Sequence, residues 1–376
     1  MNLKDIRNEI DQIDDQLINL FTKRMDCSRR VAEYKLENGI PVFNAERENA
    51  ILDSVETKAG EYGASARQLY ATIMELSRAL QHNMLDSGEE LRSRILCAEP
   101  HIPFDDKNLK IACFGVPGTY ANRASDKIFP NSAPSFYPTF QDVFSAIQSG
   151  EADFGVVPIE NSSAGSVSDV YDLMLDYRFY IAASTEIAVN HCLAAIPGTK
   201  LENIKKVYSH PQALSQCSDF LRAKNFAHEE YISTAAAAKM VSESQSHTIA
   251  SICSEEAAQK YGLEIIGRGF QNTPNNTTRF IVISKKLYIG KNADKISLCF
   301  SLPHTTGSLY RVLCRFAANG LNLTKIESRP MHNTSFEYLF YLDFTGTIKN
   351  LSTLSLLCAL SDELTEFSFL GNSETI

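Results

Sequence analysis

Two cations continue an apolar stripe near the amino terminus. The stripe repeats at steps of three and four residues, typical of one face of a long α-helix, and consists of Leu3, Ile6, Ile10, Ile13, Leu17 and Leu20. Arg24 stands seven residues after Leu17, and Lys35 eleven residues after Arg24. At about 100° and about 1.5 Å per residue, Lys35 returns to within about 20° of the same face, roughly 16 Å further along. A cation on a buried face needs an anion.

The position of Arg24 and Lys35 on the stripe has two interpretations, a structural one and a ligand-binding one. The cations either form internal salt bridges with Asp14, Glu46 or Glu48, or mark an exposed end of the stripe; alternatively, they line a pocket for a dianionic small molecule. Ser77 and Gln81, one turn apart on a predicted helix over 66–85, would add neutral hydrogen bonds. We expect the first helix to end at Gly39-Ile40-Pro41 and Asn44 to cap the second. Three helices of these lengths do not bury the stripe, which favours a dimer of intertwined helices.

Residues 1–90 resemble the all-helical chorismate mutase family. The resemblance rests on the separations of Arg7, Arg24, Lys35, Arg47-Glu48, Ser77 and Gln81. It implies an intertwined dimer that rearranges chorismate to prephenate, a pericyclic reaction that needs no nucleophile. Arg7, reaching into the partner's pocket, and Arg24 would clamp the two carboxylates. Lys35 and Gln81 would donate to the ether oxygen, and Glu48 would accept from the ring hydroxyl. Asn44, Arg47 and Ser77 would complete the site, with Asn44 where the family commonly has Asp.

The central segment has polar loops directly after short apolar runs. These loops begin at Gly115, Glu160 and His210, and they include Thr119. In open α/β sheets such strand ends gather ligand-binding groups in one crevice. The loop at Gly115 is not G-x-G-x-x-G, so we exclude a dinucleotide site. No acidic or histidine partners stand at metal-ligand spacing from His191 or His210, which favours structural histidines.

Residues 109–284 resemble prephenate dehydratase through four motifs that occur in order. They are Pro158-Ile159-Glu160-Asn161-Ser162, His191-Cys192-Leu193, Ser209-His210-Pro211-Gln212 and Asn276-Thr277-Thr278-Arg279-Phe280. The resemblance implies two α/β subdomains, like those of periplasmic binding proteins, with prephenate between them. Thr278 would protonate the leaving hydroxyl while CO2 departs, and Arg279 would hold a carboxylate. The implied substrate-binding residues are Thr119, Glu160, Asn161, Ser162, Ser209, His210, Gln212, Thr277, Arg279 and Phe280. Val116 and Ala121 depart from the usual pattern.

Residues 295–376 read as strand, helix, strand, strand, helix, strand, with Asn319-Gly320 as the turn after the first helix. The segment resembles an ACT regulatory domain of ferredoxin-like α+β fold. The matching phenylalanine-binding residues are Gly307, Ser308, Leu309, Glu327, Ser328, Arg329 and Pro330, with Ser308 where Ala is more usual. Without the resemblance, the pattern predicts a small α+β packing domain.

Amino-acid composition limits the classes of protein to which the chain can belong. The 376 residues carry 36 Lys+Arg against 45 Asp+Glu, a net charge of −9, which argues against a nucleic-acid binder working by general electrostatics. Nine dispersed cysteines without C-x-x-C indicate free thiols in a reducing compartment. We find neither a signal peptide nor an apolar run of about 18 residues, and we expect a cytoplasmic protein without a membrane partner. The predicted domains are 1–90, 109–284 and 295–376, with a helix tail and a linker over 85–108 and a second linker over 285–294.

The order mutase, dehydratase, ACT resembles the bifunctional P-protein family over nearly the whole chain. It implies a multidomain enzyme that takes chorismate to prephenate and then to phenylpyruvate, inhibited by L-phenylalanine, without cofactor or metal. We expect a homodimer or a tetramer. One rival is a dehydratase whose helical segment has decayed to a dimerisation scaffold; another is a non-catalytic sensor of aromatic amino acids. Retention of Thr278 and of Arg7, Arg24 and Lys35 argues against both. The missing dinucleotide fingerprint excludes a fusion with prephenate dehydrogenase.

Overall fold

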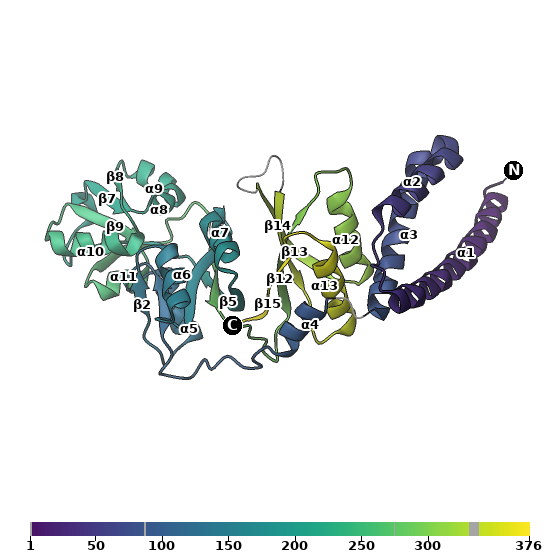
Figure 1. Cartoon of the computed structure of the whole chain (residues 1–376). Coiled ribbons are helices and arrows are strands. Elements are labelled where there is room, and N and C mark those ends of the chain that lie inside the picture. Colours follow the sequence, from purple (N-terminus) through teal and green to yellow (C-terminus); the bar gives the residue numbers. More distant parts are fainter. Residues whose placement is uncertain (1, 86–87, 274, 331–337) are drawn as a thin grey trace. The chain divides into compact units, whose positions relative to one another are not determined.

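A computed structural model describes residues 2–85, 88–273, 275–330 and 338–376 (Figure 1). The chain divides into two compact bodies. The first comprises Met1–Cys97 and Lys295–Phe369, and the second comprises Ala98–Asp294 and Leu370–Ile376. The amino-terminal helices therefore share a body with the carboxy-terminal segment.

The first body begins with three helices, α1 (Leu3–Asn38), α2 (Ala45–Ala59) and α3 (Gly63–Met84). The predicted boundaries are confirmed: Gly39 ends α1 in the left-handed conformation (φ 62°), and the Asn44 side chain caps α2 by accepting from the backbone N–H of Arg47 at 2.9 Å. A short 3-10 turn, η1 (Gly60–Tyr62), joins α2 to α3. Both α1 and α2 pack against α3.

The apolar stripe of α1 is exposed along its length. Leu3, Leu17 and Leu20 are each more than half exposed, whereas the only buried residues of α1 are Ser28 and Ala32, near its carboxyl end. Figure 1 shows α1 as one long helix, coloured purple. The first half of α1 therefore presents an apolar surface that this single chain does not cover.

The carboxy-terminal module has the predicted element order. It comprises β12 (Lys295–Leu302), α12 (Ser308–Ala318), β13 (Asn322–Pro330), β14 (Tyr338–Thr345), α13 (Leu351–Glu363) and β15 (Ser368–Thr375). Strand β14 pairs antiparallel with both β12 and β13. Figure 1 shows α12 and α13 together on one side of this sheet, and both helices contact α3. Phe300, Phe316 and Phe344 form its buried aromatic core.

The stretch predicted as a helix tail and a linker contains a separate helix, α4 (Glu89–Leu96), so the linker part of that prediction is wrong there; residues 86–87 lie outside the described residues. Leu91 and Ile95 of α4 are buried, and the helix contacts α13. Gly88, just before α4, has a φ of 71° and donates its N–H to the Asp362 carboxylate at 2.8 Å. A Cβ at Gly88 would lie 2.6 Å from the backbone of Cys358, so glycine is required there.

The second body contains two sheets, as the two predicted α/β subdomains require. The first sheet has the order β2 (Ser135–Tyr137), β1 (Ile111–Phe114), β3 (Phe154–Asn161), β11 (Thr277–Ser284), β5 (Tyr180–Ala188), with β4 (Gly165–Ser166) beside β3. Strand β11 runs antiparallel to both neighbours. Its helices are α5 (Tyr120–Ile128), α6 (Phe140–Ser149) and α7 (Ser168–Tyr177).

The second sheet has the order β10 (Glu264–Arg268), β6 (Cys192–Ala195), β9 (Ile249–Cys253), β7 (Lys206–Ser209), β8 (Ala227–Glu230). Its helical elements are η2 (Leu201–Asn203), α8 (Pro211–Gln216), α9 (Ser218–Ala223), α10 (Thr234–Ser244) and α11 (Glu255–Lys260). The chain enters this lobe after β5 and returns through β11. Residues on β3 and β11 are therefore placed where the two lobes are joined.

The second predicted linker, 285–294, is packed rather than free, so that prediction is also wrong. Leu287, Ile289 and Ala293 are buried, and the backbone of Glu99 pairs with that of Leu287 and Ile289 at 2.9 Å. All nine cysteines lie in the described part of the chain, and none of them is in a disulfide. Among the described residues, no helix is both long and apolar enough to cross a membrane.

Candidate active sites

The helical candidate site centres on Arg24 and Ser77, which the structure brings together. The Arg24 guanidinium donates to the Ser77 hydroxyl at 2.5 Å, and Ser77 donates to the carbonyl of Ile73 at 2.9 Å. One turn on, the Gln81 amide nitrogen donates to the Ser77 carbonyl at 3.3 Å. The buried amide oxygen of Gln81 accepts from no residue in the described part of the chain. This arrangement leaves the amide oxygen for a ligand donor and the second N–H of the amide nitrogen for a ligand acceptor.

Lys35 and Glu48 lie close to each other without forming an ion pair. The Lys35 ammonium donates to the backbone carbonyl of Val42. Burial lowers the pKa of Lys35, and the negative charge of Glu48 offsets part of that effect. The Glu48 carboxylate instead pairs with Arg78, a residue that the sequence analysis did not single out. Its only sequence signal is Glu75 three residues earlier, which is an ordinary surface pattern on a helix.

The salt-bridge interpretation of the two cations is wrong within the described residues: Arg24 and Lys35 pair with a hydroxyl and a carbonyl, not with Asp14, Glu46 or Glu48. Arg47 is exposed at the start of α2. Arg7 lies on α1, seventeen residues before Arg24, so about 26 Å of helix separates the two in one chain. A single chain therefore does not bring Arg7 into this site.

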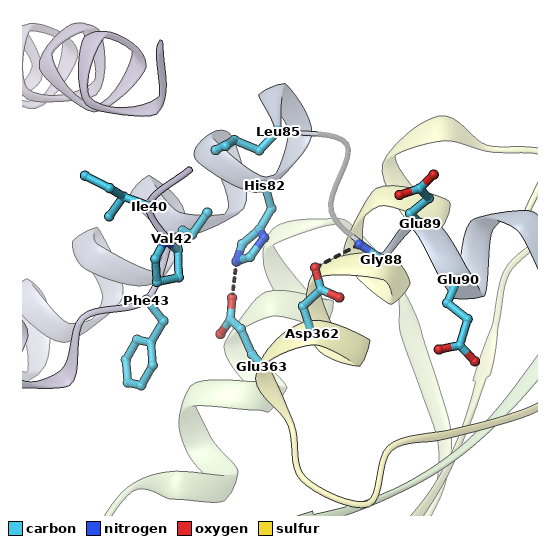
Figure 2. Close-up of a pocket in the computed structure, with 11 residues that line it drawn as sticks. Ile40, Val42, Phe43, His82, Leu85, Gly88, Glu89, Glu90, Asp362 and Glu363 are labelled. Atoms are coloured by element: carbon cyan, nitrogen blue, oxygen red, sulfur yellow. Dashed lines mark hydrogen bonds and ion pairs between the residues drawn. The ribbon is translucent and has the colours of Figure 1, made fainter. Parts of the chain in front are cut away.

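A cavity of about 680 Å³ lies next to these helices, between the loop at Ile40–Phe43 and the ends of α3 and α13 (Figure 2). Figure 2 shows His82 pointing at Glu363, to which it is joined at 2.5 Å. Burial favours a raised pKa for the Glu363 carboxyl, but the hydrogen bond from His82 and the charges of Arg315 and Arg78 outweigh it and lower the pKa to about 2.

The second candidate site is built where β3 pairs with β11, with Asn161 opposite Thr278 and Glu160 opposite Arg279. The Asn161 amide oxygen accepts from the backbone N–H groups of Ser163 and Ala164, both at 3.0 Å. Those groups can only donate, so the amide nitrogen must face the other way, where it donates to the Thr278 hydroxyl at 2.8 Å. The Thr278 oxygen is thus an acceptor, and its own proton remains available to a ligand.

Asn276 and Gln212 extend this hydrogen-bonded group. The Asn161 nitrogen also donates to the Asn276 amide oxygen at 2.8 Å, and Gln212 of the other lobe donates to the Asn161 oxygen at 3.4 Å. The buried amide nitrogen of Asn276 has no acceptor within the described residues. Asn276 belongs to the fourth dehydratase motif but is not among the predicted site residues. Residue type and spacing do not show which asparagine is buried.

Other predicted residues have structural partners. The Ser209 hydroxyl is buried and donates to the carbonyl of Ile252 at 2.6 Å, and Phe280 is in the core of the first lobe. Thr119 caps α5, and Ser162 accepts from the backbone N–H of Thr277 at 2.9 Å.

Both histidines form hydrogen bonds that fit structural roles. His191 lies between the Tyr120 hydroxyl and the Gln216 amide, and burial lowers its pKa, against the bond to Gln216. His210 caps α8, and burial lowers its pKa, with the charge of Glu230 opposing. Within the described residues no group of side chains has the make-up of a metal site.

The predicted regulatory residues lie on two elements of one module. Gly307 has a φ of 81° and precedes α12, where the Ser308 hydroxyl donates to the Thr305 carbonyl at 2.9 Å. Glu327, Ser328, Arg329 and Pro330 end β13, which contacts α12.

The chain is similar to known proteins over most of its length. A family model described as chorismate mutase type II matches residues 6–82, and one described as prephenate dehydratase matches residues 111–287. A bifunctional chorismate mutase/prephenate dehydratase of Aquifex aeolicus is 34% identical over 92% of this chain and 90% of its own. An Arabidopsis thaliana arogenate dehydratase/prephenate dehydratase is 35% identical over 72% of this chain and 70% of its own. The structure of Arthrobacter aurescens prephenate dehydratase with L-Phe is 28% identical, covers 71% of this chain and 90% of its own, and has a TM-score of 0.65.

Proposed function

This chain belongs to the family of bifunctional chorismate mutase/prephenate dehydratases, and we propose how its residues carry out the two reactions. It rearranges chorismate to prephenate, and it converts prephenate to phenylpyruvate, CO2 and water. The observation that carries the residue assignment is the hydrogen bond from Asn161 to Thr278, since its direction leaves the threonine proton available.

In the dehydratase reaction, Thr278 donates its proton to the ring hydroxyl, which leaves as water. The carbon–carbon bond to the carboxylate breaks, CO2 departs, and that electron pair completes the aromatic ring. Hydroxide is a poor leaving group, so protonation lowers the barrier most. The amide nitrogen of Asn161 then stabilises the charge on the Thr278 oxygen until solvent returns the proton. Arg279 and the unpaired amide nitrogen of Asn276 bind substrate carboxylates.

In the mutase reaction the protein moves no proton. Arg24 and Arg7 of a second copy hold the carboxylates of chorismate in the compact conformer. Lys35 and Gln81 donate to the ether oxygen as its bond breaks and negative charge grows there. Glu48 accepts from the ring hydroxyl. The Asn44 side chain caps α2, which supports a structural role for this residue in place of a carboxylate that would bind substrate.

The assembly we propose is a homodimer, or a tetramer built from it, in which α1 of each copy covers the apolar stripe of the other. Two features of the described chain support it: the stripe is exposed, and Arg7 is about 26 Å from Arg24 along one helix. We also propose that residues 295–376 form an ACT domain, which the βαββαβ order supports. Phenylalanine would bind at Gly307–Leu309 and Glu327–Pro330, in line with the L-Phe complex of the 28% identical dehydratase.

Substitution of Thr278 tests the proton-donor assignment. Thr278→Ala removes the hydroxyl and should lower dehydratase kcat by about 10²-fold or more, whereas Thr278→Ser keeps a hydroxyl and should retain part of the activity. The measurement is phenylpyruvate formation from prephenate. Equally small losses in both variants would show that Thr278 only packs against its neighbours.

A further inference from the structure

Three carboxylates and two guanidinium groups form a buried ionic cluster in the first body. Arg78 pairs with Glu48 and Glu75, and Arg315 pairs with Glu75 and Glu363, the Arg315–Glu75 distance being 2.6 Å. The Arg78 and Arg315 side chains are only 7% and 6% exposed. The cluster therefore runs from α2 through α3 to α12 and α13 in direct ion pairs.

The cost of burying these charges indicates that they fix geometry. Well-packed apolar residues of similar volume are often at least as stabilising as a buried ion-pair cluster, so burial of five charges is weak support for a stabilising role. A planar guanidinium, by contrast, fixes its partners' directions. One terminal nitrogen of Arg78 meets Glu48 and the other meets Glu75, while the third guanidinium nitrogen lies 3.7 Å from Glu363, so Glu75 and Glu363 both help to orient the group that holds Glu48. The Phe43 ring, 5.0 Å from the Arg78 guanidinium carbon, restricts the same group.

Glu48 is the member of this cluster that reaches the mutase site. Its carboxylate is 21% exposed, the least buried of those paired with Arg78, and its charge acts on Lys35 of α1. Glu48 is thus paired with Arg78, and its charge also acts on Lys35. Its carboxylate can accept from a substrate hydroxyl only if it keeps its charge and its direction.

We propose that Arg78 is a positioning residue for Glu48 in the mutase reaction, and that Glu75 and Arg315 hold Arg78 in turn. Arg315 lies on α12, so the carboxy-terminal module supplies part of the support of the mutase site. This inference rests on the proposed role of Glu48. The Arg78 guanidinium is held through Glu75 by Arg315 of α12. Its direction thereby bears on chemistry carried out by the amino-terminal helices.

The test begins with Arg78→Met and Arg78→Lys in the full chain. Mutase kcat and KM are measured, with dehydratase activity of the same sample as the internal control. Removing the guanidinium leaves the Glu48 carboxylate without the group that fixes its direction. Mutase kcat should therefore fall about tenfold, with a smaller change in KM. Arg78→Lys should fall between the parent and Arg78→Met.

A second variant keeps the charge balanced in case Arg78→Met does not fold. Glu75→Gln combined with Arg315→Met removes one anion and one cation, and leaves Glu363 as the only carboxylate partner of Arg78 besides Glu48 among the described residues. We expect a loss of about threefold in mutase kcat, with a smaller change in KM. Arg311→Met is the matched control: Arg311 lies one turn before Arg315 on α12 and donates to Thr306 and Ser308, and its mutase parameters should equal the parent's.

The proposal would be overturned if the mutase kcat and KM of both Arg78→Met and the double variant equalled those of the parent. A rise in mutase kcat would overturn it as well. A parent chain without mutase activity would overturn the proposed function, and this inference with it. If Glu48→Gln lowers mutase activity while both cluster variants do not, the function of Glu48 stands and only the positioning role fails.

Discussion

Asn161 fixes the direction of the hydrogen bond on which the proposed dehydratase chemistry depends. Two backbone N–H groups hold its amide oxygen, so its nitrogen must donate to Thr278. An aspartate at this position would still accept from Ser163 and Ala164. Its other oxygen, however, would accept the proton of Thr278 and divert it from the substrate.

We therefore expect Asn161→Asp to lower dehydratase kcat at least about tenfold at neutral pH, with a smaller change in KM. Assays with prephenate across a range of concentrations give both values. Mutase activity in the same sample serves as the control and should match that of the parent. A kcat within twofold of the parent would show that the direction of this bond does not matter.

At single residues, the sequence predicted some of the side chains that the structure brings together, but not all of their partners. The motifs around Thr278 and Arg24 named groups that the structure brings beside Asn161 and Ser77. The Arg78–Glu48 pair was missed, because Arg78 meets Glu48 across thirty residues of chain and a helical pattern does not reveal which way a cation points. Ser209 was predicted to bind substrate, yet its hydroxyl is bonded to the Ile252 carbonyl.

Long periodic elements were predictable, and short ones were not. The stripe of α1 repeats over many turns, so its period and its end at Gly39 are plain in the sequence. Helix α4 has only eight residues, of which four are charged, so its sequence does not distinguish it from a helix tail followed by a linker. It is helical because Leu91 and Ile95 are buried where α4 contacts α13, and no local sequence pattern predicts such a tertiary contact.

The exposed stripe of α1 makes a prediction about assembly. Leu17 is 54% exposed in the single chain and would be buried between copies. We expect Leu17→Asp to shift the protein toward monomer and to lower mutase activity about 10²-fold or more, because Arg7 of the second copy is lost, while dehydratase activity stays within a few-fold. Sedimentation velocity and the two assays measure this. Asp15→Asn, on the opposite face of α1, should change neither; a dimeric, active Leu17→Asp would contradict the assignment.

The junction of α3, α12 and α13 makes a prediction about pH. The pKa of Glu363 is lowered from 4.5 to about 2, so this carboxylate stabilises the fold above about pH 4.5 and loses its contribution as pH falls toward 2. At about 1.4 kcal/mol per pH unit, the loss is on the order of 3 kcal/mol. Thermal melts between pH 6 and pH 2 should show a steeper decline in Tm for the parent than for Glu363→Gln. Parallel declines would rule out this contribution.

For the whole molecule, the two bodies do not follow the order of the chain. Residues 370–376 return to the dehydratase body, where Glu374 and Thr375 pair with β5 and the carbonyl of Ile376 accepts from Lys127 at 2.8 Å. Residues 285–294 pack there as well. A truncation near Ser284 would therefore damage the dehydratase itself, so phenylalanine binding is better tested by calorimetry on the full chain.

The central claim is that one chain carries two independent active sites. The most direct test measures both activities in Arg24→Ala and Thr278→Ala of the full chain. We expect Arg24→Ala to lose most mutase activity and to keep dehydratase activity within about twofold, and Thr278→Ala to show the reverse, because a clamp or a proton donor serves only its own site. Parallel loss of both activities in either variant, with an unchanged Tm and assembly state, would contradict the account.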